Sequence, residues 1–407
     1  MRRSTDYFLS SHGGNLPRPA AFDAKLARFA EHEAEIAVEL PKAVQWVVDK
    51  QIECGVDIVN DGEYVKAANG GNYGSYMTPR MTGFERIDRP ADWKPRRGGP
   101  GERERPDFPG FYASGLWYAG SGGPVRPGFV QPPMPGAGAA GQPPAKISAC
   151  TGPVKYIGHA EVEKDIVALK TALKGKSDVD GFIAALGPFS LSAMTTNYHY
   201  KDDRDYMFAL ADVMREEYKA ITDAGLNLQV DEPEFATTWS FHPDWSVADL
   251  RKYLDFMVEV INHAVRGLPE EQIRFHMCWG SGHRPHVQDI EFRHIVDKLL
   301  QINVQAYSFE ASNPRHAHEY HVFEDVKLPD GKIIVPGVVG HYTDLVEHPD
   351  LVAERLCNFA RLVGMENVHA GTDCGIGSRV GHEEIVWAKL KAMAEGCRIA
   401  GKRMKGK

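Results

Sequence analysis

Five stretches of the sequence place an acid, a histidine or a cysteine directly after a short apolar run. In chain order they are Asp61-Gly62-Glu63, Asp231-Glu232-Pro233, His276-Met277-Cys278, Glu310 and Asp373-Cys374-Gly375. If the apolar runs are parallel strands of one barrel, their carboxyl ends share one face, and that face is where the active sites of such barrels lie. The pattern therefore predicts one site assembled from five strands.

Four of these residues are of the types that bind metal ions, namely His276, Cys278, Glu310 and Cys374. His276 and Cys278 are two residues apart, so on a strand both side chains point to the same face. Zinc accepts nitrogen, sulfur and oxygen ligands, and ligands gathered from three strands indicate a catalytic site. Such a zinc would be electron-rich and better suited to carry a nucleophilic thiolate than to activate water. A buried strand end with a hydrogen-bonded histidine explains the same pair without a metal.

The elements that would position these residues alternate along the chain. Amphipathic stretches at 205–224, 248–266, 289–302, 350–363 and 383–400 predict helices between the apolar runs, which favours a parallel α/β sheet. No GxGxxG motif follows the first run, which weakens a dinucleotide-binding fold. We expect a TIM-type (β/α)8 barrel, with the run at 147–150 as an accessory strand. The predicted strands are 7–10, 56–60, 147–150, 181–186, 226–231, 273–278, 304–310, 333–338 and 368–373.

One region has a biased composition. Residues 95–144 contain 11 of the 26 prolines and 12 of the 40 glycines of the chain. We therefore expect a single barrel domain over residues 1–407, with a Pro/Gly-rich insertion at 83–146. The insertion also contains the aromatic residues Phe108, Phe111, Tyr112, Trp117, Tyr118 and Phe129. So many aromatic residues favour an ordered segment that packs over the barrel or onto a second subunit. A mobile surface loop remains the alternative.

Composition limits the class of protein. The 407 residues are 43% hydrophobic and 25% charged with a net charge of −8, so the chain is globular and nucleic acid is not expected as its partner. The start of the sequence lacks the apolar stretch of a secretory signal, and no apolar run is long enough to cross a membrane. The six cysteines form no CxxC pair and do not indicate a disulfide framework. We expect a cytoplasmic protein that needs no membrane, and leave a homo-oligomer open.

Eight segments of the chain resemble the catalytic C-terminal barrel of the cobalamin-independent methionine synthase family. The combination of HMC, a later glutamate and DCG is the most specific part of this resemblance. The segments follow the family's order and cover most of the chain outside the insertion. They are SHGGNLPRP (11–19), DIVNDGEY (57–64), TGPVKYIG (151–158), LQVDEPEF (228–235), FHMCWG (275–280), SFEAS (308–312), VPGVV (335–339) and GTDCGIGSR (371–379).

The resemblance implies a zinc-dependent transferase that alkylates a thiol, in most cases by methyl transfer to homocysteine. The family's zinc ligands fall on His276, Cys278, Glu310 and Cys374. Its acceptor-binding acids fall on Glu63 and Asp231, which would hold the substrate ammonium, although acids at strand ends also bond to loop amides. Its first-loop backbone contacts fall on Gly13, Gly14 and Asn15. The partners implied are a small-molecule thiol acceptor and an alkyl donor.

The sequence departs from the family in three places. The chain has one barrel where full-length methionine synthases have two, so binding of a folate polyglutamate is in doubt. Where the family has a proton-donating histidine, this sequence has Tyr342, with His341 beside it. The segment GSGHRPH (280–286) is inserted near the metal ligands. A methylcorrinoid, a methyl ether or an epoxide is therefore a reasonable alternative donor to methylfolate.

The epoxide alternative follows from the related epoxyalkane:coenzyme M transferases. In that reaction His341 or Tyr342 would protonate the alkoxide as the ring opens. Coenzyme M carries a sulfonate, so a cation is expected near the site, and Lys66, Arg315 and Arg379 are candidates. A decarboxylase of the wider superfamily and a non-catalytic zinc-stabilised barrel are weaker alternatives. The tract HAHEYH (316–321) is interpreted as hydrogen-bonded histidines of a loop rather than a second metal site or a proton relay.

Overall fold

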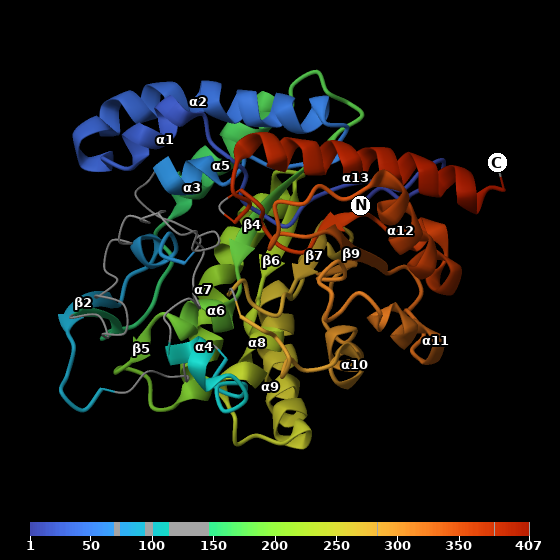
Figure 1. The fold of residues 1–407 in the computed structure, drawn as a ribbon. Coiled ribbons are helices and arrows are strands. Elements are labelled where there is room, and N and C mark those ends of the chain that lie inside the picture. Colours follow the sequence, from blue (N-terminus) through green and yellow to red (C-terminus); the bar gives the residue numbers. More distant parts are fainter. Residues whose placement is uncertain (69–73, 94–100, 114–145, 283, 378, 407) are drawn as a thin grey trace.

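The computed structural model describes residues 1–68, 74–93, 101–113, 146–282, 284–377 and 379–406, and Figure 1 shows its fold. Most of the predicted insertion, including Trp117, Tyr118 and Phe129, lies outside the described residues. None of the helices within the described ranges is long and apolar enough to cross a membrane.

The core of the molecule is a curled sheet of seven parallel strands. Their order is β1-β4-β6-β7-β8-β9-β10. Each strand of this sheet pairs with the next one along the chain, and the strands missing from the series belong to a second, smaller sheet. Strands β7 and β8 are buried at every residue, as expected when helices cover a parallel sheet. The strands are β1 (Ile58–Val59), β4 (Asp180–Leu186), β6 (Asn227–Asp231), β7 (Ile273–His276), β8 (Ala306–Phe309), β9 (Ile333–Val339) and β10 (Gly371–Thr372).

Residues 8–11 bring the two edges of this sheet together. The amide of Ser11 donates to the carbonyl of Ala370, which lies next to β10, at 2.9 Å. On the other side, the amides of Asp57 and Ile58 donate to the carbonyl of Ser10 at 3.1 and 3.0 Å. The expected first strand is thus reduced to a single bridging residue, Ser10, within an extended segment. The result is a curled parallel sheet consistent with the expected TIM-type barrel.

Long amphipathic helices cover the outside of the sheet, and α2 and α13 lie side by side over one part of it (Figure 1). Polar caps fix their starts: Asp202 accepts from the amide of Asp205 at the start of α7, and Ser246 and Asp249 form a capping box at the start of α9. The long helices are α2 (Phe29–Glu53), α5 (His159–Ala172), α7 (Asp203–Asp223), α9 (Val247–Val265), α12 (Pro349–Val363) and α13 (Glu383–Met404).

The helix expected over 289–302 is much shorter. It consists of a 3-10 turn at Phe292–His294 and α10 (Val296–Leu299). The preceding residues stay in a loop because the Asp289 carboxylate bonds to side chains of that loop. The remaining short helices are α1 (Ala20–Leu26), α3 (Tyr64–Ala68), α4 (Pro109–Ala113), α6 (Pro188–Ala193), α8 (Glu234–Phe241) and α11 (Val322–Asp325), with 3-10 turns at Thr78–Arg80, Glu270–Gln272, Glu319–His321 and Met365–Asn367.

A second sheet of three strands lies beside the main one. It consists of β2 (Phe84–Asp88), β3 (Lys146–Cys150) and β5 (Thr196–Asn197), in the order β2-β3-β5. The accessory role predicted for 147–150 is therefore confirmed. A buried ionic group anchors the chain that leads into β2, since Arg80 donates to Glu217 of α7 and Asp165 of α5, each at 2.9 Å.

Candidate active site

Three of the expected metal ligands meet at the carboxyl ends of the strands. His276 is the last residue of β7, Cys278 lies two residues further on, and Cys374 follows β10. Their ligand atoms all lie within 4.8 Å of one another, and no ion is part of the structure. His276 and Cys278 are buried. The i, i+2 spacing puts His276 and Cys278 on one face, and the curling of the sheet brings the end of β10 towards the end of β7, although β8 and β9 lie between these strands in the sheet.

The ring of His276 is oriented for a ligand. Its Nδ1 lies 3.0 Å from the hydroxyl of Ser308 on the neighbouring strand β8. Its Nε2 is buried without a hydrogen-bond partner among the described residues. A histidine that binds a metal through one nitrogen commonly donates from the other to a polar group, which fixes the tautomer. The orphaned Nε2 beside two sulfurs therefore fits a metal ion that takes nitrogen and sulfur ligands.

The two thiols differ in their acidity. The hydrogen bond from Cys278 holds the pKa of the Cys374 thiol well below its usual range, and Arg379 acts in the same direction although burial opposes both. The Nη1 atom of Arg379 lies 3.6 Å from Sγ of Cys374. The same pairing, together with burial, raises the pKa of Cys278. Cys374 is therefore the more acidic thiol of the pair.

Glu310 lies beside this cluster rather than in it. Its ligand atom groups with those of His341 and Asp373, again within 4.8 Å. One carboxylate oxygen accepts from the amide of Trp279 at 2.8 Å and the other from the Asn313 side chain at 3.1 Å. Burial raises the pKa of Glu310 well above its usual range. Of the four expected ligands, the structure brings three into one group and holds the fourth in an adjoining group.

The two residues expected to handle a proton also lie here. His341 is 0% exposed, and neither ring nitrogen has a hydrogen-bond partner within the described part of the chain. Burial lowers its pKa well below the usual range, so the ring is neutral near pH 7. The ring of Tyr342 lies 3.8 Å from it, centroid to centroid, and its hydroxyl donates to the carbonyl of Gly280. Burial raises the pKa of Tyr342.

Two acids, the half-buried Glu63 and the buried Asp231, lie near the same cluster. Glu63, just after β1, has a left-handed backbone with φ of 64°, and burial raises its pKa to about 7. Asp231 ends β6, and burial raises its pKa to about 6. The charge of Cys374 contributes to the rise at both acids, so the acids and the thiolate lie within electrostatic reach of one another.

The loop at Gly13, Gly14 and Asn15 approaches this group closely. The amide of Gly13 donates to the hydroxyl of Thr372 at 2.9 Å. A Cβ atom on Gly13 would lie 2.8 Å from the carbonyl carbon of Cys374, and one on Gly14 would lie 3.0 Å from the Glu63 carboxylate. The loop therefore needs glycine to lie between the thiolate and the acid.

Two buried polar residues, Gln229 and Arg274, also contact the site, although they were not among the residues predicted from the sequence. The side chain of Gln229 donates to Asp231 at 2.5 Å and to the carbonyl of Gly13 at 2.8 Å. Arg274 donates to Gln229 at 2.5 Å and to the carbonyl of His12 at 2.7 Å. The pair thus orients an acid and the glycine loop. The signal for it was present, because Gln229 and Asp231, like Arg274 and His276, alternate on one face of otherwise apolar strands.

The three candidate cations have different surroundings. Arg379 lies against Cys374, as described above. Lys66 is buried, donates to the carbonyl of Ala184 and lies 4.2 Å from the centre of the Tyr76 ring. Arg315 donates to the carbonyl of Val287 at 3.1 Å. Arg379 is therefore the cation nearest to the sulfurs.

The histidine tract at 316–321 is held by carboxylates. His316 bonds to Glu319 at 2.6 Å and His321 to Glu324 at 2.7 Å. Neither of the two groups that could hold a metal in the described ranges includes this tract.

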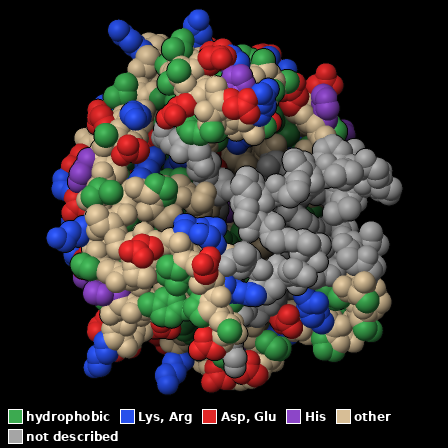
Figure 2. Space-filling model, turned by 90° about the vertical axis from the view of Figure 1, so that its left-hand side faces the viewer, with side chains coloured by type: hydrophobic (Ala, Val, Ile, Leu, Met, Phe, Trp, Pro, Cys, Tyr) green, Lys and Arg blue, Asp and Glu red, His purple; other side chains and the backbone are tan. Residues whose placement is uncertain are grey.

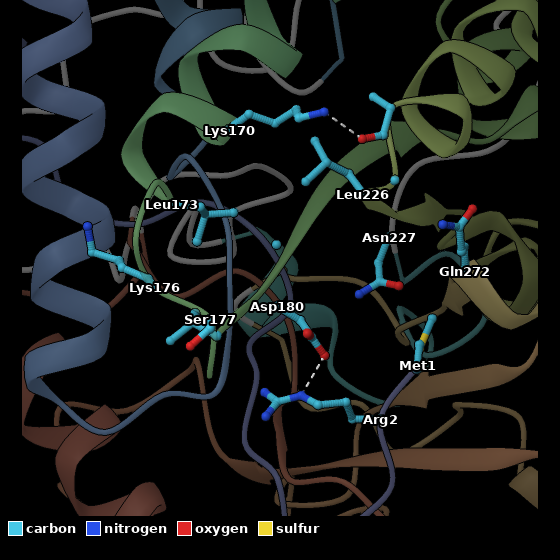
Figure 3. Close-up of a pocket in the computed structure, with 14 residues that line it drawn as sticks. Met1, Arg2, Lys170, Leu173, Lys176, Ser177, Asp180, Leu226, Asn227 and Gln272 are labelled. Atoms are coloured by element: carbon cyan, nitrogen blue, oxygen red, sulfur yellow. Dashed lines mark hydrogen bonds and ion pairs between the residues drawn. The ribbon is translucent and has the colours of Figure 1, made fainter.

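The side of the molecule at the left of Figure 1 carries α3, α4, β2 and β5. Figure 2 views it face-on and shows a hollow near its middle with basic side chains at the edge. A separate cavity of about 490 Å³ lies at the opposite ends of the strands, next to Asp180 and Asn227, where β4 and β6 begin (Figure 3). Its charges are already paired, since Arg2 bonds to Asp180 and Lys170 to the carbonyl of Ala224, both at 2.9 Å. It takes no part in the candidate site.

The fold and the site together define a parallel α/β-barrel protein with a thiolate and imidazole cluster, suited to a metal ion, at the carboxyl ends of its strands. Residues 141–398 match the profile of the family described as "Cobalamin-independent synthase, Catalytic domain". The match covers more than half of the chain, so the chain belongs to this family, and the resemblance predicted from its motifs is confirmed.

Individual relatives are distant in sequence. A 2-hydroxypropyl-CoM lyase of Xanthobacter autotrophicus is 24% identical over 95% of this chain and 93% of its own length. A methionine synthase of Sulfurisphaera tokodaii is 24% identical over 63% of this chain and 71% of its own length. Among solved structures, a B12-independent methionine synthase from Shewanella sp. W3-18-1 in complex with selenomethionine has a TM-score of 0.67 at 19% identity, covering 98% of this chain and 100% of that one. The structural likeness supports the barrel fold.

Proposed function

We propose that this protein is a zinc-dependent transferase that alkylates a small thiol, with homocysteine as the acceptor and a methyl group as the group transferred. The observation that carries the proposal is the group of His276, Cys278 and Cys374, in which the buried Nε2 of His276 has no hydrogen-bond partner among the described residues and the pKa of the Cys374 thiol is lowered. Glu310 would complete the ligand set from the adjoining group. The protein would work as a single barrel domain over residues 1–407, in the cytoplasm.

Zinc held by these residues would stabilise a substrate thiol as the thiolate, which is the nucleophilic form, near neutral pH. The chain's own residues would do the rest. Glu63 and Asp231 would hold the substrate ammonium once both are ionised, with Gln229 fixing the direction of Asp231. The backbone of Gly13, Gly14 and Asn15 would line the acceptor on the other side.

The leaving group takes up a proton from solvent as it departs, and His341 and Tyr342 are the residues proposed to stabilise it by donating a hydrogen bond. His341 is neutral, so it would act by donating a hydrogen bond from its ring N–H rather than as an imidazolium. Tyr342 has its hydroxyl on the Gly280 carbonyl and would have to release this bond in order to reach a substrate. The surroundings of His341 favour it over Tyr342 as the donor.

A second function has its own support, namely addition of the thiol of coenzyme M to an epoxide. The relative with the lyase name aligns along 95% of this chain, and the methionine synthase cited above along 63%. Arg379, next to Cys374, provides a cation for the sulfonate of coenzyme M. In this reaction the carbon–sulfur bond would form as the epoxide carbon–oxygen bond breaks. His341 or Tyr342 would donate a hydrogen bond to the alkoxide, and the proton that the thiol loses on binding would return to this oxygen through solvent.

Absorption titration of the Co²⁺-substituted protein tests both proposals. Homocysteine should increase the thiolate-to-cobalt charge-transfer absorption, and 2-mercaptoethanesulfonate should do so instead if the second function is right. A spectrum that neither thiol changes would contradict both proposals, because the metal would then lack an open position. The Cys374→Ser variant should lose metal affinity, and full zinc stoichiometry and affinity in this variant would remove Cys374 from the ligand set.

A further inference from the structure

The described part of the insertion reaches into the loop that follows β7. Glu104 is 0% exposed although it belongs to a segment outside the main sheet. One of its carboxylate oxygens accepts from the hydroxyl of Tyr112 at 2.5 Å and from Nη1 of Arg284 at 3.2 Å. The other accepts from the amide of Val287 at 2.9 Å. Buried carboxylates need such a full set of partners, so the insertion and the loop at 280–289 are held together at this point.

Arg103, the neighbouring residue, attaches the same segment to α8 and the turn after it. Its guanidinium lies 3.4 Å from the centre of the Trp239 ring. It also donates to the carbonyls of His242 and Trp245 at 2.6 and 2.7 Å. The position of Glu104 is therefore fixed from two sides.

Arg284 carries the contact onward to the metal ligands. Its side chain is 5% exposed, and its Nη2 atom donates to the carbonyl of Trp279 at 3.0 Å and to Asp289 at 2.7 Å. The amide of the same Trp279 donates to Glu310 at 2.8 Å. A continuous series of hydrogen bonds thus runs from Glu104 through Arg284 and Trp279 to Glu310, although residues 104 and 310 are far apart in the sequence.

The side chain of Trp279 is held in place by neighbouring residues of the same loop and by His316. Its indole N–H donates to the carbonyl of Ile290 at 2.7 Å. The ring of His316 stacks on the indole with a centroid distance of 3.8 Å, and His316 bonds in turn to Asp289 and Glu319. Ile290 and Asp289 belong to the loop that Arg284 and Glu104 hold, so a shift of this loop would also move Trp279 and change the direction of its backbone amide.

We propose that Glu104 is a positioning residue of the metal centre, which fixes the carboxylate of Glu310 through Arg284 and the backbone of Trp279. The inference rests on the proposed function, because it takes Glu310 as a metal ligand. Groups that orient a ligand from outside the coordination sphere typically change metal affinity by about 10- to 100-fold when they are replaced. The described part of the insertion would then influence the metal centre from outside the main sheet.

The test compares Glu104→Gln with Glu102→Gln in the full-length protein. Glu102 lies on the same segment, and its ion pair is with the half-exposed Arg105. Competition with a chromophoric chelator should show that Glu104→Gln binds Zn²⁺ and Co²⁺ about 10-fold more weakly, with a changed Co²⁺ ligand-field spectrum. Glu102→Gln should leave both unchanged. Wild-type affinity and spectrum in Glu104→Gln would overturn the proposal.

A double-mutant cycle separates positioning from a general structural effect. If Glu104 acts through Glu310, then Glu104→Gln should weaken metal binding no further when Glu310 is already Gln. Full additivity would overturn the proposal. If Glu310→Gln itself keeps wild-type affinity, the ligand set of the proposed function fails as well. Should Glu104→Gln fold poorly, Arg284→Lys offers the same test, since lysine keeps the charge but cannot span all the partners of Arg284; unchanged metal affinity in this variant would equally overturn the proposal.

Discussion

Glu63 should destabilise the protein near neutral pH. Its ordinary pKa of 4.5 rises to about 7 in the folded state, and burial is the largest cause. A raised pKa means that the folded state favours the protonated acid. The stabilisation this gives is fully present below about pH 4.5 and is lost as the pH rises through 7. At 1.36 kcal/mol per pH unit, the loss is at most about 3 kcal/mol, an upper value because the side chain keeps partial access to solvent.

Glu63→Gln removes the charge and keeps the size of the side chain. At pH 8 the metal-free variant should be more stable than the wild type by up to about 3 kcal/mol. For 407 residues the entropy of unfolding is about 0.85 kcal/mol per kelvin, so the melting temperature should rise by about 3 to 4 °C. At pH 5 the difference should fall to about 1 kcal/mol, or about 1 °C, because the folded state then holds Glu63 protonated while the unfolded acid, with its ordinary pKa of 4.5, is mostly ionised. Thermal melting with a chelator and a thiol reductant at both pH values measures the difference.

The control is Glu85→Gln, which changes an exposed glutamate of β2. It should shift the melting temperature by less than about 1 °C at either pH, as most exposed substitutions do. An equal effect of Glu63→Gln at pH 5 and pH 8 would refute the reasoning, since the charge of Glu63 would then carry no burial penalty. The same variant should lose affinity for homocysteine. The charge of Glu63 would thus lower the stability of the metal-free protein and favour binding of the substrate.

Three further predictions concern the ionic anchor, the glycine loop and the buried acids. Arg80→Met leaves two buried carboxylates unpaired and should lower stability by about 3–5 kcal/mol, seen as a drop of about 4–6 °C in melting temperature with metal affinity unchanged. Gly13→Ala places a Cβ atom 2.8 Å from the backbone of Cys374 and should cost about 1–3 kcal/mol, with weaker metal binding in a chelator competition. The acids at the ends of β1 and β6 have pKa values of about 7 and 6, so calorimetry should show homocysteine binding tighten as the pH rises from 5.5 to 8. A thiol without an ammonium group should gain less affinity over the same range, because only the loss of its thiol proton then favours binding at higher pH. Equal gains for the two thiols, or a flat profile for homocysteine, would contradict the role of these acids.

The sequence predicted the positions of most main strands because each is an apolar run that ends in a polar residue. The runs at 181–186 and 226–231 match β4 and β6 to within one residue at either end. The run at 368–373 yields only the two residues of β10, and the run at 7–10 only a bridge. Backbone pairing of these two segments depends on how the two edge strands of the curled sheet come together. The apolar character of the segments alone does not specify this.

The candidate site was predictable where it depends on spacing along one strand. The adjacency of His276 and Cys278 follows from the period of two, and the closeness of Cys374 follows from parallel strands sharing one end. The grouping of Glu310 with His341 was not predictable, because it depends on where the Trp279 amide and Asn313 hold the carboxylate. The contact between Glu104 and Arg284 joins residues 180 positions apart and leaves no local signal in the sequence.

The meeting of the sheet edges at residues 8–11 has a consequence for biosynthesis. The extended segment around Ser10 bonds on one side to residues near position 57 and on the other to Ala370. During translation the first of these contacts can form early, but the second must wait until more than three hundred further residues have left the ribosome. Until then the edge beside Ser10 keeps unpaired backbone groups, which invite association between nascent chains. We therefore expect refolding yield to fall with protein concentration more steeply than the stability of the finished barrel would suggest.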